Sequence, residues 1–405
     1  MRALWFANNS VGYPGARPDE GGGWMRGLAD ACRRVSGLEL GISFFDKSGR
    51  PPVSDGNVSW FPVNRPGGFL RRVPRLFRYS AVDRDDCRLC ESVIARFRPD
   101  VIHVFGTEQV FGLLCGTAGI PFVIHLQGLM GPCLNAWVPP GFSFFDCVWR
   151  GRTDPVSFAR GAWALSVNRH AARREREIMR RGTAFMGRTD WDRAFVSLYA
   201  PGARYFPCGE ALRPEFFAES HRTPPSRPTF VSTLSSPLYK GHDVVLKTAK
   251  VLCETGNLDF EWRVFGVPDF RFAEKKTGIR AADVNVRPFG RVSGETVRNE
   301  LLACTAYVHP SYIDNSPNSI CEAQVLGVPV LATDVGGVSS IVEDGKTGFL
   351  VPANDPLMTA RRMLDMASGI LRLPDGWEAG PRLRNDPDRV AGRVVEVYKE
   401  MLLLP

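Results

Sequence analysis

The chain has 405 residues, a length that predicts two domains of roughly 200 residues each. Its 44% hydrophobic and 23% charged residues exclude a disordered or fibrous protein. Its apolar runs are also far shorter than the ~18 residues of a transmembrane helix. A formal net charge of +8 favours a negatively charged partner: nucleic acid, an anionic membrane surface or a phosphorylated small molecule.

The N-terminal sequence MRALWFANNS predicts a strand. It lacks the apolar h-region and the small-residue cleavage site of a signal peptide, so we expect the protein in the cytoplasm. The ten cysteines have no repeated spacing, and Cys87 and Cys90 are the one close pair. This pattern indicates reduced core thiols rather than a metal site.

Apolar runs and helical patterns alternate through the first half of the chain. We expect strands at 3–8, 39–45, 58–63, 100–106, 121–128, 185–189 and 203–208, and helices at 23–35, 87–97, 108–118 and 190–199. The helix at 87–97 is preceded by DRDD, residues 83–86, which resembles an acidic metal motif but is better interpreted as a helix start. Such alternation predicts βαβ units with a parallel sheet.

The alternation of strand and helix patterns is interrupted between the two halves of the chain. Residues 210–228 contain four prolines and no periodicity, which predicts a linker. The alternation then restarts, with strands expected at 229–234, 261–266, 284–290, 306–311, 329–335 and 348–352, and helices at 243–254, 293–305, 317–327 and 389–404. We therefore predict an N-terminal domain at 1–209, a C-terminal domain at 229–388 and a C-terminal helix at 389–405.

The segment SYIDNSPNSICEAQVLGVPVLATDVGG, residues 311–337, carries the main candidate site. Ser316 is the expected N-cap of a helix that has Pro317 at its first position. The first backbone N–H groups of this helix, those of Asn318 and Ser319, favour a phosphate there together with the positive end of the helix dipole. A glycine at position 327 should end the helix.

Two carboxylates flank this helix start. Glu322 shares a helix face with Asn318 and Ser319, and it can accept hydrogen bonds from a ribose diol. Asp314 precedes the helix and can hold hydroxyls of a sugar on the other side of the phosphate. The pair Gly336–Gly337 would let the backbone approach a ligand closely. The alternative interpretation is an ordinary capped helix with two unrelated acidic residues.

This segment resembles the E-x7-E donor motif of the large retaining family 4 glycosyltransferases. The resemblance runs from HPSYIDNSPNS to EDGKTGFLV, and LSSPLYKGHDVVL resembles the Lys-Gly segment of that family. It implies the GT-B fold, an α/β architecture of two Rossmann-like parallel-sheet domains that face each other across a cleft. In that fold the C-terminal helix can cross back to the N-terminal domain.

The resemblance also implies roles for individual residues at a donor site. Glu322 would bind the donor ribose, Asp314 would contact the transferred sugar, and Lys240 would face the diphosphate. Further donor-binding residues are expected at Ser235, Asn315, Ser316, Asn318 and Ser319. The chain departs from the family pattern at Asp314, where glutamate is usual, and at Ser235, where an arginine is frequent.

The N-terminal half supplies two further candidates. Gly21, Gly22 and Gly23 resemble the glycine pair that approaches the donor diphosphate, although a plain turn is the alternative. His125 resembles the histidine that these enzymes hold near the reacting centre, and a structural role is its alternative. His103, inside the strand expected at 100–106, is expected in the core or one layer behind the site.

The implied reaction transfers a hexose-type sugar from a nucleoside diphosphate sugar to a hydroxyl of a glycan or lipid-linked glycan, with retention, in surface polysaccharide synthesis. No metal or other cofactor is expected. A non-catalytic nucleotide-sugar-binding partner of another transferase is the alternative. Nucleic acid is not an expected partner, because no aromatic-basic motif on a known scaffold is present.

The positive charge gathers in the N-terminal half. Arg169, Arg173, Arg176 and Arg180 recur at helical spacing, and FLRRVPRLFRY, residues 69–79, interleaves arginine with apolar residues. Such a face suits a peripheral position on the inner face of an anionic membrane, near a lipid-linked acceptor. The alternative is a solvated arginine face with ion pairs through Glu175 and Glu177.

Overall fold

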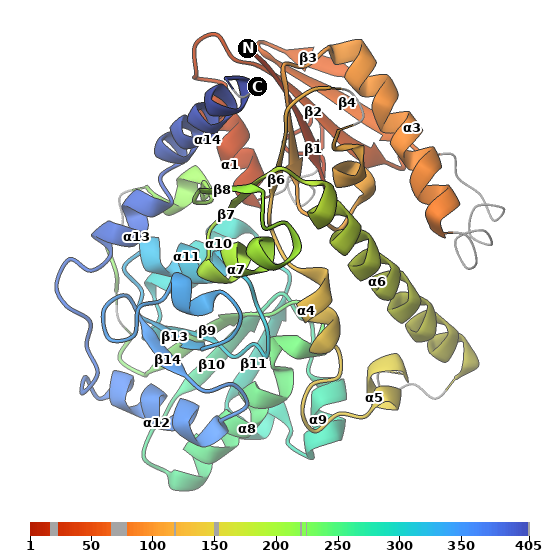
Figure 1. The fold of residues 1–405 in the computed structure, drawn as a ribbon. Coiled ribbons are helices and arrows are strands. Elements are labelled where there is room, and N and C mark those ends of the chain that lie inside the picture. The colour runs from red at the N-terminus through yellow and green to blue at the C-terminus, as the bar shows by residue number, and fades with distance from the viewer. Residues whose placement is uncertain are drawn as a thin grey trace. The chain divides into compact units, whose positions relative to one another are not determined.

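The structure is a computed structural model that describes residues 1–16, 23–65, 79–116, 119–149, 154–218, 221–223 and 225–403. The chain forms two compact units, each built on its own sheet (Figure 1). The first unit contains Met1–Gly131, Trp163–Arg213 and Asp386–Pro405, and the second contains Pro132–Ala162 and Pro214–Asn385.

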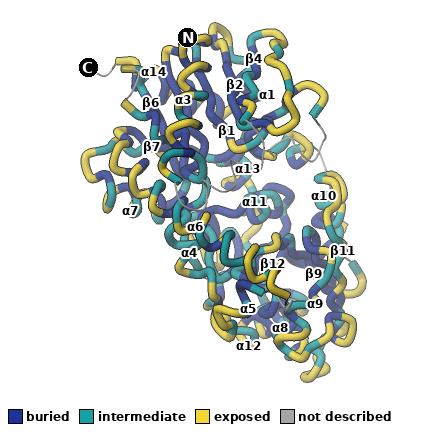
Figure 2. The backbone as a smooth tube through the Cα atoms, turned by 90° about the vertical axis from the view of Figure 1, so that its right-hand side faces the viewer, coloured by how far each residue is buried: buried dark blue, intermediate teal, exposed yellow. Residues whose placement is uncertain are grey.

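The sheet of the first unit has the strand order β3-β4-β2-β1-β5-β6-β7-β8. All neighbours are parallel except the hairpin of β3 and β4. The strands are β1 Arg2–Ala7, β2 Glu39–Asp46, β3 Val53–Asp55, β4 Val58–Asn64, β5 Val101–Phe105, β6 Phe122–His125, β7 Ala184–Gly187 and β8 Arg204–Pro207. Figure 2 shows β1 and β2 buried.

Helices cover both faces of this sheet, because successive side chains of a buried strand point to opposite sides. Ala3, Trp5 and Ala7 pack with α1 (Gly23–Cys32) and α14 (Pro387–Leu402). Leu4 and Phe6 pack on the other side, where the helices are α3 Tyr79–Phe97, α6 Pro155–Arg181, α7 Asp190–Tyr199 and the 3-10 helix η2 Val110–Leu114. The part of α6 before Trp163 belongs to the second unit.

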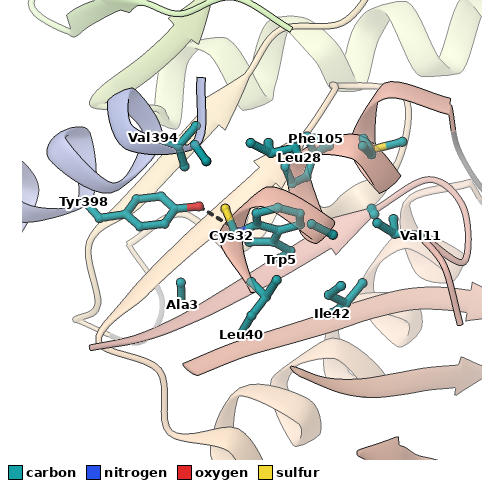
Figure 3. Close-up of a cluster of buried hydrophobic side chains, with 14 of the residues drawn as sticks. Ala3, Trp5, Val11, Leu28, Cys32, Leu40, Ile42, Phe105, Val394 and Tyr398 are labelled. Carbon is teal, nitrogen blue, oxygen red and sulfur yellow. Dashed lines mark hydrogen bonds between the residues drawn. The ribbon is translucent and has the colours of Figure 1, made fainter. Parts of the chain in front are cut away.

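The C-terminal helix α14 belongs to the first unit, the crossing back that the resembled fold allows. The Asp386 side chain caps α14 by accepting a hydrogen bond from the Arg389 backbone N–H. One apolar face of α14 is buried in the same core as β1 and α1, and Figure 3 shows Val394 and Tyr398 beside Trp5 and Cys32. Hydrophobic burial therefore returns the end of the chain to the sheet on which it began.

The second unit has a parallel sheet in the order β11-β10-β9-β12-β13-β14. Its strands are β9 Thr229–Thr233, β10 Glu261–Phe265, β11 Val286–Gly290, β12 Ala306–His309, β13 Val330–Thr333 and β14 Phe349–Val351. Its helices include α8 His242–Thr255, α9 Arg271–Thr277, α10 Gly294–Leu302, α11 Asn318–Val325, α12 Pro356–Ala367 and α13 Ala379–Arg384. Shorter ones are α4 Met130–Asn135, which begins in the first unit, α5 Phe144–Trp149, η3 Pro214–Phe216, η4 Leu238–Lys240, η5 Ala281–Val284 and η6 Val338–Ser340. Two Rossmann-like α/β domains with parallel sheets are thus confirmed.

Two helix predictions were wrong. The helix expected at 108–118 is only η2, where Gly112 lets the chain approach Ile178 so closely that a Cβ would come within 2.4 Å of its Cγ2 atom. The helix expected at 87–97 begins at Tyr79, so Asp83 and Asp86 lie inside it and are buried rather than at its start. Among the helices of the described ranges, none is both long and apolar enough to cross a membrane.

Candidate functional site

The strand order of the second unit reverses between β9 and β12, since the chain moves outward from β9 to β10 and β11 and then continues on the opposite side from β12 to β13. In such a sheet the loops at the carboxyl ends of the two central strands diverge and leave a ligand-binding crevice. The loop after β9 carries Lys240, and the loop after β12 carries Asp314. Both predicted residues therefore follow strands at this reversal.

Lys240 and Asp314 form an ion pair in which Nζ lies 2.5 Å from Oδ2. His309, at the end of β12, places its Nε2 atom 3.0 Å from the same oxygen. Burial would raise the pKa of Asp314, but Lys240 and His309 outweigh burial and hold this pKa well below its usual range. Asp314 is therefore a carboxylate at neutral pH. The sequence analysis assigned no role to His309.

The two loops are joined through their backbones. The Tyr312 N–H donates to the Tyr239 carbonyl at 2.7 Å, and the Tyr312 hydroxyl donates to Asp243 at 2.8 Å. Gly241 has a φ of +83°, and a Cβ at this position would lie 2.1 Å from the Pro310 carbonyl oxygen. Glycine is therefore required where the Lys240 loop touches the Asp314 loop.

The loop after β13 holds Asp314 from another direction. The Gly337 N–H donates to the Asp314 carbonyl at 3.1 Å. Gly336 has a φ of +56°, and a Cβ there would lie 2.0 Å from the same carbonyl oxygen. The close approach predicted for this glycine pair is thus made to the protein's own backbone. Three adjacent loops fix the position of Asp314.

Helix α11 starts one residue later than predicted. Pro317 is the N-cap, with φ −68° and ψ 121°, and no side chain caps the helix, so the N-cap assigned to Ser316 was wrong. The extended ψ of Pro317 excludes it from the first turn, which begins at Asn318. The predicted stop is confirmed: Gly327 has a φ of +69°, and the Val328 N–H donates to the Ala323 carbonyl at 2.9 Å.

Helix α11 contacts β12 through the buried hydroxyl of Tyr307. This hydroxyl lies 2.9 Å from Thr233 Oγ1 and also forms a hydrogen bond with the Ser319 side chain. Burial raises the pKa of Tyr307 to about 12, and the charge of Glu322 acts in the same direction. Ser319 and Glu322 are therefore both close to Tyr307 of the central strand β12.

The remaining predicted donor residues lie along the same loops. The Asn315 N–H donates to Asp314 Oδ1 at 3.1 Å, and Ser316 is buried. Ser235 is exposed at the start of the loop after β9, where its carbonyl accepts a hydrogen bond from His242 Nε2 at 3.0 Å. Ser235 thus contributes no cation to the loop that carries Lys240.

The other predicted residues belong to the first unit. Gly21 and Gly22 lie outside the described residues, and Gly23 is the exposed first residue of α1. His125 ends β6 and is fully buried. Burial, with the charge of Arg188, lowers the pKa of His125 to about 3, so its imidazole is neutral at physiological pH.

Sequence analysis missed a partly buried carboxylate in the first unit, where the strand order reverses between β1 and β5. Glu108 follows β5 and accepts a hydrogen bond from Asn8 Nδ2 at 2.9 Å. Gly106 has a φ of +79°, and a Cβ there would come 1.9 Å from Glu108 Oε2. Burial raises the pKa of Glu108. A glutamate two residues after a glycine at a strand end was the available signal.

Comparison with known proteins finds a protein family that matches the second unit. Residues 215–369 match the family Glycosyl transferases group 1. The second unit therefore carries a group 1 glycosyltransferase domain, the one that contains Lys240, Asp314 and Glu322.

Curated relatives match over parts of their length. D-inositol 3-phosphate glycosyltransferase of Streptomyces avermitilis is 42% identical over 139 residues, which are 32% of this chain and 30% of the relative. The amylovoran biosynthesis glycosyltransferase AmsK of Erwinia amylovora is 23% identical over 188 residues, 44% of this chain and 46% of the relative. The matches thus span less than half of either relative.

Solved structures match over the whole chain. Sucrose-phosphate synthase from Thermosynechococcus elongatus has a TM-score of 0.73 at 14% identity, covering 99% of both chains. HepE of Anabaena, solved in complex with UDP-glucose, has a TM-score of 0.64 at 14% identity and covers 99% of this chain and 100% of its own. These neighbours confirm the predicted GT-B fold.

Proposed function

We propose that the protein transfers a hexose-type sugar from a nucleoside diphosphate sugar to a hydroxyl of a glycan or lipid-linked glycan acceptor, with retention at the anomeric carbon. The observation that carries this proposal is the Lys240–Asp314 pair beside the start of α11, at the strand-order reversal of the second unit. A crevice with an ammonium group, helix N–H groups and two carboxylates suits a diphosphate that joins two sugars.

Each group has a separate task in this reaction. The α11 amides and Lys240 hold the diphosphate and stabilise its charge as it leaves. Asp314 accepts hydrogen bonds from hydroxyls of the transferred sugar, and Glu322 accepts them from the ribose. Retention is proposed to proceed on one face of the sugar, with the leaving phosphate taking the acceptor proton. Positioning then supplies much of the catalysis. The UDP-glucose bound to HepE supports this donor class, and the amylovoran role of AmsK supports a polysaccharide product.

Donor binding tests the proposal directly. Glu322→Ala should weaken binding of the cognate donor about 10–100-fold, because two charge-assisted hydrogen bonds to the ribose are lost. The measurement is the thermal shift of the purified protein with a panel of UDP- and GDP-sugars. Glu254→Ala is the matched control, because Glu254 lies on the exposed surface of α8 and forms an ion pair with Lys250 at 3.5 Å. An unchanged donor-induced shift in Glu322→Ala would contradict the proposal.

The non-catalytic alternative predicts the same binding but no turnover. A purified wild-type chain that binds a donor and neither transfers nor hydrolyses its sugar would favour this alternative. The proposed enzyme should instead release the nucleoside diphosphate in the presence of acceptor.

The arginine stripe supports a membrane-bound acceptor. Arg169, Arg173, Arg176 and Arg180 are all exposed on α6, and none forms an ion pair within the described part of the chain. The alternative, ion pairs of these arginines through Glu175 and Glu177, is not favoured, because Glu175 is buried and Glu177 pairs with Arg181. Of the second basic stretch, 69–79, only Tyr79 lies in the described residues.

We accordingly propose that the protein works in the cytoplasm, with α6 of the first unit facing the inner surface of the membrane. Vesicles containing phosphatidylglycerol should bind the protein at low salt and release it at high salt, since each arginine near such a surface contributes about 1 kcal/mol. Replacing the four stripe arginines by glutamine should abolish co-sedimentation, whereas lysine replacements should retain it. Equal binding by both variants would refute this role of α6.

A further inference from the structure

A line of four buried side chains connects the C-terminal helix to the end of β6. Trp5 Nε1 donates to the Tyr398 hydroxyl at 2.7 Å, the bond drawn in Figure 3. His103 Nδ1 lies 2.6 Å from the same hydroxyl, and His103 Nε2 lies 3.2 Å from His125 Nδ1. All four side chains are fully buried, so water takes no part in these hydrogen bonds.

We propose that Tyr398, acting through His103, keeps the single proton of His125 on Nε2 and so makes His125 a hydrogen-bond donor to an oxygen of the substrate. Tyr398 and His103 are positioning residues in this inference. The role of His125 at substrate rests on the function proposed above, whereas the placement of its proton does not.

The direction of the bonds follows from the donors available. An indole N–H can only donate, so the Tyr398 oxygen accepts from Trp5. The Tyr398 hydroxyl proton then reaches His103 Nδ1, which must accept it. A neutral imidazole carries its proton on the other nitrogen, so His103 Nε2 donates to His125 Nδ1. The proton of His125 is thereby left on Nε2.

The opposite direction leaves a buried proton without an acceptor. If His103 Nδ1 donated to Tyr398, the oxygen would accept two bonds and its own proton would have no partner among the described residues. A buried unsatisfied donor of this kind costs about 1–3 kcal/mol. The chain of bonds that begins at Trp5 therefore has one favoured direction.

Both histidines are neutral, which this arrangement requires. Burial lowers the pKa of His103 well below its usual range, and His125 follows the same trend. The His125 Nε2 atom is buried and has no hydrogen-bond partner in the described residues. A neutral ring with an unused N–H suits a sugar hydroxyl or a phosphate oxygen. It does not suit the abstraction of a proton at Nε2.

The tautomer can be observed without any assay of transfer. In the full chain labelled with 15N-histidine, long-range 15N–1H correlation should show His125 protonated on Nε2, with its signals assigned by their loss in His125→Gln. Tyr398→Phe should mix or reverse the tautomers of both histidines. Tyr205→Phe, which removes a hydroxyl bound to the Thr189 carbonyl at 3.2 Å in the same unit, should leave them unchanged. A proton on Nδ1 of wild-type His125, or unaltered tautomers in Tyr398→Phe, would overturn the inference.

Kinetic measurements then distinguish a positioning role of Tyr398 from an effect of this residue on stability alone. Tyr398→Phe should lower kcat about tenfold in the wild-type background, as expected for one misdirected hydrogen bond. In the His125→Gln background the same change should cost less than about twofold, because the glutamine amide donates without a tautomer. An equal loss in both backgrounds would mean that Tyr398 acts on the fold alone.

Discussion

Lys240→Met should lower glycosyl transfer about 10²–10³-fold, the effect of removing one positioned charge from a leaving group. Methionine keeps the apolar stem of lysine, so the second unit should remain folded. Initial rates with the donor identified by thermal shift provide the measurement. Lys250→Met is the matched control, since that lysine forms a half-exposed pair on α8. Full activity in Lys240→Met would remove Lys240 from the mechanism.

The same variant has a pH signature in stability. Lys240 holds the pKa of Asp314 below its unfolded value of about 3.9. The pair therefore stabilises the fold at pH values above about 4, and this contribution is lost as the pH falls through the lower, folded-state pKa. We expect Lys240→Met to lower the free energy of unfolding by about 3 kcal/mol at neutral pH. The difference from wild type in denaturant melts should shrink below about pH 4.

Gly336→Ala should disrupt the loop that carries Asp314 and with it the donor site. The added Cβ would meet the Asp314 carbonyl oxygen at 2.0 Å, and alanine is also strained at a φ of +56°. The loop before α11 must therefore move. We expect a loss of several kcal/mol in stability, at the upper end for single substitutions, together with loss of donor binding.

Gly345→Ala isolates the part of this effect that is due to backbone strain. Gly345 has a φ of +73°, and a Cβ there meets no atom within 4 Å. This variant should lose only about 1 kcal/mol and keep its donor-induced thermal shift. Comparable losses of donor binding in the two glycine variants would show that contact with Asp314 is unimportant.

Local signals in the sequence predicted most of the architecture. The alternation of apolar runs and helical patterns located the central strands of both sheets, because side-chain period and turn chemistry act over a few neighbouring residues. The stop at Gly327 was predicted for the same reason. The start of α11 was misplaced by one residue, since Ser316 and Pro317 are both compatible with an N-cap until the ψ of the proline is known.

Local signals failed where a distant residue decided the outcome. The segment 108–118 has a helical pattern, yet the approach of Gly112 to Ile178 limits it to a short 3-10 helix. His309 gave no sequence signal because a histidine at a strand end is common, and its importance lies in its contact with Asp314. Glu108 likewise became a candidate only when Asn8 and Gly106 were brought to it.

The sequence alone therefore specified two α/β halves and the residues that follow their strands, since these depend on hydrophobic periodicity and on short loops. Tertiary structure alone decided which of those residues meet. Lys240 and Asp314 are 74 positions apart, and His103 and Tyr398 are 295 apart. No local pattern encodes such pairs, because they form only when burial of the sheets and of α14 brings remote segments into contact.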